Sequence, residues 1–377
     1  MKQTLLVLWV FCALAAAAQQ SGPALSKNQL ALGAPPTNDF SGVASTLADP
    51  PAQESKPAPA QKKNPPLISN PPVEIKRPII DASMVGYIDN AIVGSEVRIR
   101  FDAAFNNDRP DRAEFIYGKC GCYRNPPPVD PNSPGPGPGV PQNINFQVLS
   151  FMGEYAPTRR FSGFIEIPVR WLQPQGEAVQ GLPVPAFPNG AGISDLLVGL
   201  KFALLASPTR YLTAQLKTYF PSGDGRRGLG TSHYSLEPAL LYYQRFGESE
   251  RFEMEGELGG WLPIGGSATQ SPSGAVIPSS SGFAGNIFFY GIGPSYRLVD
   301  HEQFRLAPVI ELVGWNVTGG QETGGPLSAS GTNIVNLKIG ARMSFHSRDS
   351  VYVGYGVALT SADWYNDIVR VEYRHTF

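Results

Sequence analysis

The last nine residues, "VRVEYRHTF" (residues 369–377), decide the fold. Every second side chain from Val369 to Phe377 is large or apolar, and the positions between them are Arg370, Glu372, Arg374 and Thr376. Strict alternation of this kind is typical of a β-strand with one apolar face and one polar face. If the pattern recurs, the chain is all-β, and the question becomes what covers the apolar face.

The two-residue period begins at Glu96 and returns throughout residues 96–377. In "EVRIRFDAAF" the apolar residues Val97, Ile99 and Phe101 alternate with charged residues, and we count about twelve such segments. A soluble sandwich would bury the apolar faces in a core. A membrane barrel would expose them to lipid and turn the charged faces into its lumen.

The connections between these segments favour the barrel. Long connections, such as the one holding "PPPVDPNSPGPGPGVP" within residues 106–142, alternate with short ones such as "PTR", "ASPTR" and "GESE". Short periplasmic turns and longer external loops are typical of outer-membrane barrels. The sequence therefore predicts an antiparallel up-and-down transmembrane β-barrel of about twelve strands over residues 96–377. The last strand would pair with the first and remove the open edges. An even strand number would place both termini in the periplasm.

Aromatic residues near the predicted strand ends suggest two interfacial girdles. The outer girdle would contain Trp171, Phe220, Trp261, Trp315 and Trp364, and the inner girdle Tyr155, Phe246, Tyr296, Phe345 and Phe377.

The N-terminal region divides into three parts. Residues 1–18 have a basic start, a short apolar run and small residues before Gln19, which predicts a secretory signal peptide. A lipoprotein signal using Cys12 is disfavoured by the bulky residues before it. Residues 19–78 are rich in proline and polar residues and predict a disordered periplasmic tether, either a plain spacer or a segment that reaches peptidoglycan. Residues 79–95 are more apolar and predict a short helix or a plug-like piece at the barrel mouth.

Composition excludes several classes of function. The net charge is −1 and there is no dense basic patch, so nucleic acid is not an expected partner. Beyond the signal peptide the cysteines are Cys120 and Cys122, which could form a strained disulfide or stay free, and which lack the nearby histidines of a metal site. We expect no cofactor and no metal.

The charged faces of the strands predict a narrow lumen crossed by ion pairs. The candidate lumen-lining residues are Arg98, Arg100, Asp102, Glu166, Arg170, Asp195, Lys201, Lys217, Glu237, Glu253, Glu255, Glu257, Lys338, Arg342, Arg370 and Glu372. Glu253, Glu255 and Glu257 form the densest run of one sign. We expect them to pair with arginines on adjacent strands rather than to bind a solute.

Catalytic chemistry is not indicated. The four histidines are scattered, and Ser232 and His233 are neighbours in sequence, which does not place them within hydrogen-bonding reach. A membrane lipase would need a Ser–His contact that the sequence does not provide, so we expect no enzyme.

Residues 192–246 resemble a known family. The pattern is a strand start with Gly192, Ser194 and Asp195, a loop with Pro221, Ser222, Gly223 and Asp224, and then Gly228 and Gly230. It is similar to the outer-membrane transporters named for the meta-pathway of phenol degradation, and "NDRPDRAEF" with the following "KCGC" is similar to planctomycete members. The resemblance implies an outer-membrane barrel with a transport role and does not establish the cargo. Tyr373 and the terminal Phe377 likewise resemble the signal read by the outer-membrane insertion machinery.

Two functions of different classes follow. The first is a passive channel or transporter for small solutes, hydrophobic or aromatic ones included. The alternative is a closed structural or surface-interaction barrel that displays external loops such as residues 106–142. The expected partners are outer-membrane lipid, the insertion machinery, peptidoglycan through the tether, and a small solute.

Overall fold

The computed structural model describes residues 83–107, 143–175, 189–224, 229–231, 233–264, 269–270, 276–277, 285–301, 303–319, 330–346, 348–361 and 364–377. The predicted signal peptide, the predicted tether, Cys120, Cys122 and Gly228 lie outside these residues. No helix in the described part of the chain is long and apolar enough to cross a membrane.

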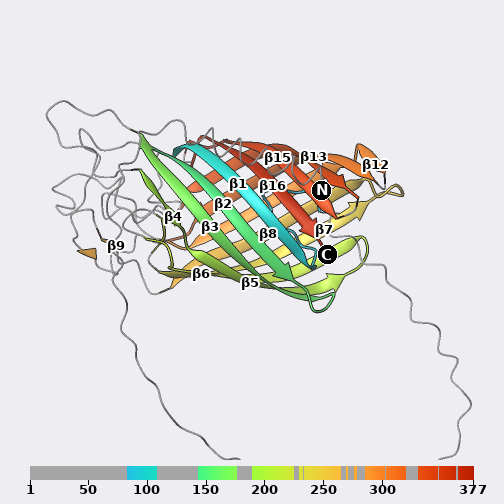
Figure 1. Cartoon of the computed structure of the whole chain (residues 1–377), viewed down its shortest axis with the longest axis horizontal. Coiled ribbons are helices and arrows are strands. Elements are labelled where there is room, and N and C mark those ends of the chain that lie inside the picture. Colours follow the sequence, from blue (N-terminus) through green and yellow to red (C-terminus); the bar gives the residue numbers. More distant parts are fainter. Residues whose placement is uncertain are drawn as a thin grey trace, which may run out of the picture. The chain divides into compact units, whose positions relative to one another are not determined.

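Twelve long strands form one closed antiparallel barrel in the described residues (Figure 1). They are β1 (Glu96–Asn107), β2 (Asn143–Tyr155), β3 (Phe161–Gln175), β5 (Leu196–Ala206), β6 (Arg210–Phe220), β7 (Tyr234–Phe246), β8 (Phe252–Ile264), β11 (Ile287–Tyr296), β13 (Phe304–Val317), β14 (Asn333–Phe345), β15 (Asp349–Ala358) and β16 (Asp367–Thr376). Each pairs with the long strand before and after it, and β16 pairs with β1. The predicted fold class and strand number are confirmed.

The described residues also contain four short strands. β4 (Gly190–Ile193) pairs with β3, and β12 (Val299–His301) pairs with β13. β9 (Thr269–Gln270) and β10 (Val276–Ile277) form a separate two-stranded sheet.

The seam between β1 and β16 closes the barrel. Its register runs without a break from Glu96 opposite Thr376 to Phe105 opposite Asp367. The amide of Phe377 then donates a hydrogen bond to the carbonyl oxygen of Ser95, at 3.1 Å. The stretch that ends the chain thus pairs with the first strand and leaves no open edge there, which is what lipid requires of a strand-built wall.

The two faces of the wall have opposite character. Outward side chains such as Leu258 and Ile339 are 53% and 56% exposed, whereas inward side chains such as Glu253, Glu311 and Arg342 are fully buried. A soluble sandwich would show the reverse, with apolar side chains inside. The exposed apolar belt and the charged interior are those of a barrel that spans a membrane.

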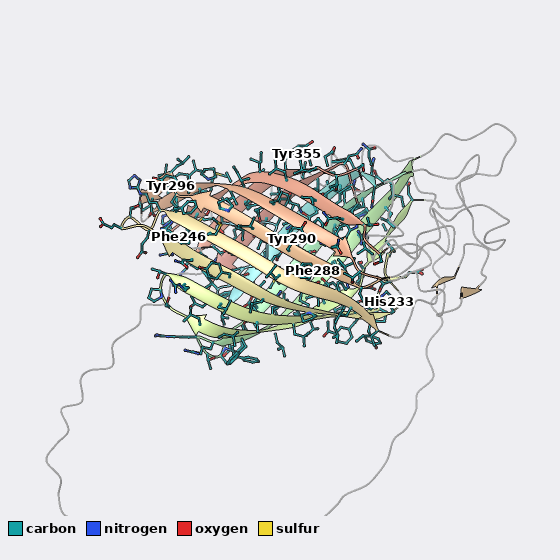
Figure 2. All side chains as sticks on the ribbon, turned by 180° about the vertical axis from the view of Figure 1, so that it is seen from behind. His233, Phe246, Phe288, Tyr290, Tyr296 and Tyr355 are labelled. Carbon is teal, nitrogen blue, oxygen red and sulfur yellow. The ribbon has the colours of Figure 1, made fainter. Side chains whose placement is uncertain are left out.

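Connection length distinguishes the two ends of the barrel. The short connections 156–160, 207–209, 247–251 and 346–348 share one end, called here the turn end, and the opposite end is called the loop end. Phe246 and Tyr296 project at the turn end, while His233 lies toward the loop end (Figure 2). Exposed aromatics at the turn end match the predicted inner girdle.

The predicted outer girdle is wrong for three of its tryptophans. Trp261 and Trp364 are buried, and the rings of Trp315 and Trp364 lie 4.3 Å apart. Trp261 is an even number of residues from the inward-facing Glu253, so strand alternation directs it inward. The three rings belong to an apolar cluster inside the loop end of the barrel, with Ile144, Phe146 and Tyr365.

Candidate functional site inside the barrel

Residues 83–94, called here the plug, pass through the barrel interior just before β1. They form bends and irregular backbone, and the helix that the sequence also allowed is not formed within these residues. The side chains of Met84, Val85, Ile88 and Ile92 are buried in contact with inward-facing wall residues. The plug is therefore packed into the lumen rather than resting on the rim.

Three wall carboxylates accept hydrogen bonds from plug amides. Glu311 accepts from the amides of Tyr87 and Ile88, both at 2.8 Å, and from that of Gly86 at 3.2 Å. Glu255 accepts from the amide of Met84 at 3.1 Å, and Glu257 accepts from that of Asp89 at 3.0 Å. Backbone that belongs to no sheet needs such partners when it is buried.

Wall donors satisfy the carbonyl groups of the plug in the same way. Arg342 donates to the carbonyl oxygens of Met84 at 3.2 Å and Val85 at 2.7 Å. Arg370 donates to the carbonyl oxygen of Gly86, at 2.6 Å. The plug therefore lies between acidic side chains of β8 and β13 and basic side chains of β14 and β16.

The plug also carries its own charge into the lumen. The Asp89 carboxylate lies 2.5 Å from the Lys217 ammonium and 2.7 Å from the Gln215 amide nitrogen. Lys217 also pairs with Glu237, at 2.8 Å. Asp89 is thus one member of a wall–plug ion-pair chain.

Close packing fixes the plug at Gly86 and Tyr87. A Cβ atom added at Gly86 would lie 2.2 Å from a ring carbon of Tyr352, so no larger residue fits there. The Tyr87 ring lies between two wall cations, with Lys338 Nζ 3.9 Å and Arg370 Cζ 4.2 Å from its centroid. Cation–π attraction of this kind is favourable, more so when the groups are desolvated.

Most other predicted lumen residues meet in buried ion pairs. Glu372 pairs with Arg342 at 2.8 Å and Arg374 at 3.1 Å. Further pairs are Arg370–Asp102 at 2.6 Å, Arg100–Glu166 at 2.5 Å, Lys201–Glu154 at 2.8 Å and Arg98 with Glu96. Glu154 and Asp89 were not among the predicted lumen-lining residues. Glu154 lies in a strand with weak alternation, and Asp89 lies outside every strand.

The run of three glutamates behaves differently from the expectation. Glu253 does pair with arginines, with Arg297 at 2.8 Å and Arg245 at 3.6 Å. Glu255 and Glu257 instead accept from plug amides. The expectation is therefore correct for Glu253 and wrong for the other two, because the plug adds donors that adjacent strands do not.

A cavity of about 270 Å³ remains beside the plug. Its lining combines charged wall residues, Arg170 among them, with aromatic ones from the loop end, including Tyr219, Trp261, Trp315 and Tyr365. Among the residues with described positions, no group of His, Cys, Asp or Glu could hold a metal ion.

The family-like motif forms a brace at the loop end. Asp195 accepts from the amide of Gly223 at 3.0 Å and from the amide and hydroxyl of Thr231, both at 2.8 Å. Ser222 Oγ accepts from the amide of Leu196 at 2.8 Å and donates to the carbonyl oxygen of Ser194 at 3.0 Å. Pro221 and Asp224 flank these contacts, and the Asp224 carbonyl accepts from Leu229. The motif thus ties the start of β5 to the loop after β6.

A Ser–His contact occurs where the sequence did not indicate one. Ser235 Oγ lies 3.2 Å from His233 Nε2, and His233 Nδ1 lies 2.9 Å from the carbonyl oxygen of Thr231. Residues two apart share a strand face, which is the signal that could have found the pair. Both side chains are buried, and neither lines the cavity beside the plug.

Comparisons with known proteins give structural similarity only. No family model matches the chain, and no curated protein matches it. An outer-membrane channel from Pseudomonas putida F1 is 15% identical, with 76% of this chain and 96% of that chain covered and a TM-score of 0.48. The β domain of the Bordetella autotransporter BrkA is 13% identical, with 75% and 100% covered and a TM-score of 0.43. The NanC porin is 8% identical, with 75% and 100% covered and a TM-score of 0.39.

Substitution of Glu372 should measurably lower the free energy of unfolding of the barrel. Replacing Glu372 with Gln leaves Arg342 and Arg374 buried without their shared anion. Breaking a buried pair in this way typically costs about 3–5 kcal/mol of unfolding free energy. Urea unfolding in lipid vesicles, followed by tryptophan fluorescence, would measure the loss. Glu248→Gln in an exposed turn serves as the control, and an equal stability of both variants would contradict the expectation.

Proposed function

We propose that this chain is an outer-membrane channel for small solutes, closed in this conformation by the plug. The observation that carries the proposal is a charged lumen occupied by a segment that is not part of the wall. Residues 83–94 have their own backbone contacts to wall side chains and no place in the strand ladder.

Hydrogen bonds and ion pairs hold the plug in the lumen, and such contacts can break and form again. A barrel with no transport role can fill its interior with wall side chains alone. Here the inward carboxylates and arginines bond to backbone groups of the plug, and those same side chains would be hydrated if the plug left. A water-filled lumen lined by both signs of charge would result, which suits small polar or amphipathic solutes.

We propose an orientation in the membrane from the different character of the two barrel ends. The first and last strands meet at the turn end, where Glu96 faces Thr376. We place this end in the periplasm, together with both termini and the tether of residues 19–78, which serves as a spacer or reaches peptidoglycan. Phe377, 76% exposed at the rim, is accessible to the insertion machinery during assembly.

The aromatic lining gives a narrower proposal for the solute. Trp261, Trp315 and Tyr365 line the cavity near the loop end, and their ring faces favour flat or apolar solutes. This agrees with the sequence resemblance to transporters named for phenol degradation.

The filled lumen also supports the second function. A barrel that never opens would act as a surface-interaction protein through its external loops. The loop of residues 108–142 lies outside the described residues. Conductance separates the two functions.

Replacing Gly86 with Val should open the channel. The new side chain would collide with the Tyr352 ring, so we expect the plug to leave its seat while the barrel wall stays intact. In planar bilayers the wild-type protein should conduct rarely and the variant persistently. Gly153→Val is the matched control, because a Cβ atom at Gly153 meets nothing within 4 Å. A folded Gly86→Val barrel without conductance would leave only the surface-interaction function.

Replacing Glu311 with Gln should raise the open probability of the channel. One carboxylate oxygen becomes an NH₂ group, which cannot accept the hydrogen bond from the Gly86 amide of the plug. Losing one charge-assisted bond to the plug weakens the seated state by about 1.5–3 kcal/mol, or roughly tenfold to a hundredfold in the equilibrium. Glu154→Gln is the control, since the Glu154 carboxylate accepts from Ser162 and Lys201 of the wall rather than from plug backbone. Single-channel records that are alike for both variants would argue against the plug as the gate.

A further inference from the structure

Lys338 differs from most of the wall cations around the cavity. Its side chain is buried, with 4% of the residue exposed, and its Nζ atom donates to the Tyr365 hydroxyl at 3.2 Å. Within the described residues no carboxylate lies within salt-bridge distance of it. The cavity-lining cations that do have carboxylate partners are Arg98, Arg100, Lys201, Lys217 and Arg370. Lys338 therefore brings a positive charge to the cavity without a matching anion.

Aromatic rings surround this charge. The Nζ atom lies 3.9 Å from the ring centroid of Tyr87, 5.5 Å from that of Trp315 and 5.8 Å from that of Tyr365. Ring faces attract an ammonium but do not neutralise it, and burial of an uncompensated charge is unfavourable. The site is thus complementary to an anion.

The carboxylate closest to Lys338 in strand register is engaged elsewhere. Glu311 on β13 lies directly opposite Lys338 on β14. Its oxygens accept from plug amides and from the Tyr352 hydroxyl instead. Seating the plug therefore withdraws the cross-strand partner that Lys338 would otherwise have.

We propose that Lys338, Trp315 and Tyr365, together with Tyr87 of the plug, bind a small organic monoanion. Its carboxylate would accept a hydrogen bond from Lys338 Nζ, and its flat or apolar body would contact the rings. The cavity of about 270 Å³ far exceeds the roughly 15 Å³ that one water needs. One uncompensated cation favours a single negative charge.

The ligand would also stabilise the closed channel. Tyr87 supplies one wall of the site, so the site is complete only while the plug is seated. By linkage, an anion that binds the seated state shifts the equilibrium toward it. This inference rests on the proposed function, because the ligand reaches the site through the lumen.

Calorimetric titration of the folded full-length protein with sodium benzoate tests the proposal, with sodium acetate and sodium chloride at equal ionic strength for comparison. We expect benzoate to bind the wild type more tightly than either other anion. Lys338→Met should weaken binding about tenfold or more, because one charged hydrogen bond is lost, whereas Lys338→Arg should retain it. Arg100→Gln removes another cation of the cavity and should change the affinity less than threefold.

Wild-type protein that does not bind benzoate, or equal binding by wild type and a folded Lys338→Met variant, would overturn the proposal. Gly86→Val should also lose binding, and unchanged affinity there would overturn the role of the plug in the site. The two proposals fail separately. A conducting Gly86→Val variant beside a wild type that binds no anion would refute only the anion site, while anion binding without conductance in any variant would refute only the channel.

Discussion

A strand in hydrocarbon must pair every backbone amide and carbonyl with another strand, and this constraint governs the whole molecule. It is met at the β1–β16 seam, where ten residue pairs join the two ends of the sheet. Once the sheet is closed, alternate side chains point either to lipid or to an enclosed interior. The apolar belt, the polar lumen and the need for internal ion pairs all follow from that closure.

The interior then has a second requirement, which is that its charges be compensated. Ion pairs among wall side chains compensate most of these charges, as with Glu372 and its arginines. The plug compensates others, because its amides face Glu255 and Glu311 while its carbonyls face Arg342 and Arg370. A polypeptide backbone carries donors and acceptors in fixed alternation, so it can fit between an acidic and a basic wall. Buried polar networks are favourable only when nearly every member has a partner.

The strands of the barrel wall could be predicted because the pattern that indicates each of them is local in sequence. Each strand has its own two-residue period of apolar side chains, and the alternation of long and short connections independently indicates an up-and-down barrel. The inward position of Trp261 could also have been read from its spacing to Glu253, but the general preference of tryptophan for membrane interfaces outweighed the strand register. The plug contacts could not be predicted, since Gly86 and Glu311 are 225 residues apart and no periodic pattern links them. For the same reason Glu255 and Glu257 were assigned to arginines, which were the only partners that strand neighbours could suggest.

The plug continues directly into β1, and this fixes how it behaves after it leaves the lumen. Twelve residues of extended chain reach at most about 40 Å, so an unseated plug stays near the barrel mouth, held by the first strand. Its effective concentration there is of the order of millimolar, as for other short flexible tethers. Return to the lumen is then a unimolecular event, whose rate is independent of how many barrels the membrane holds.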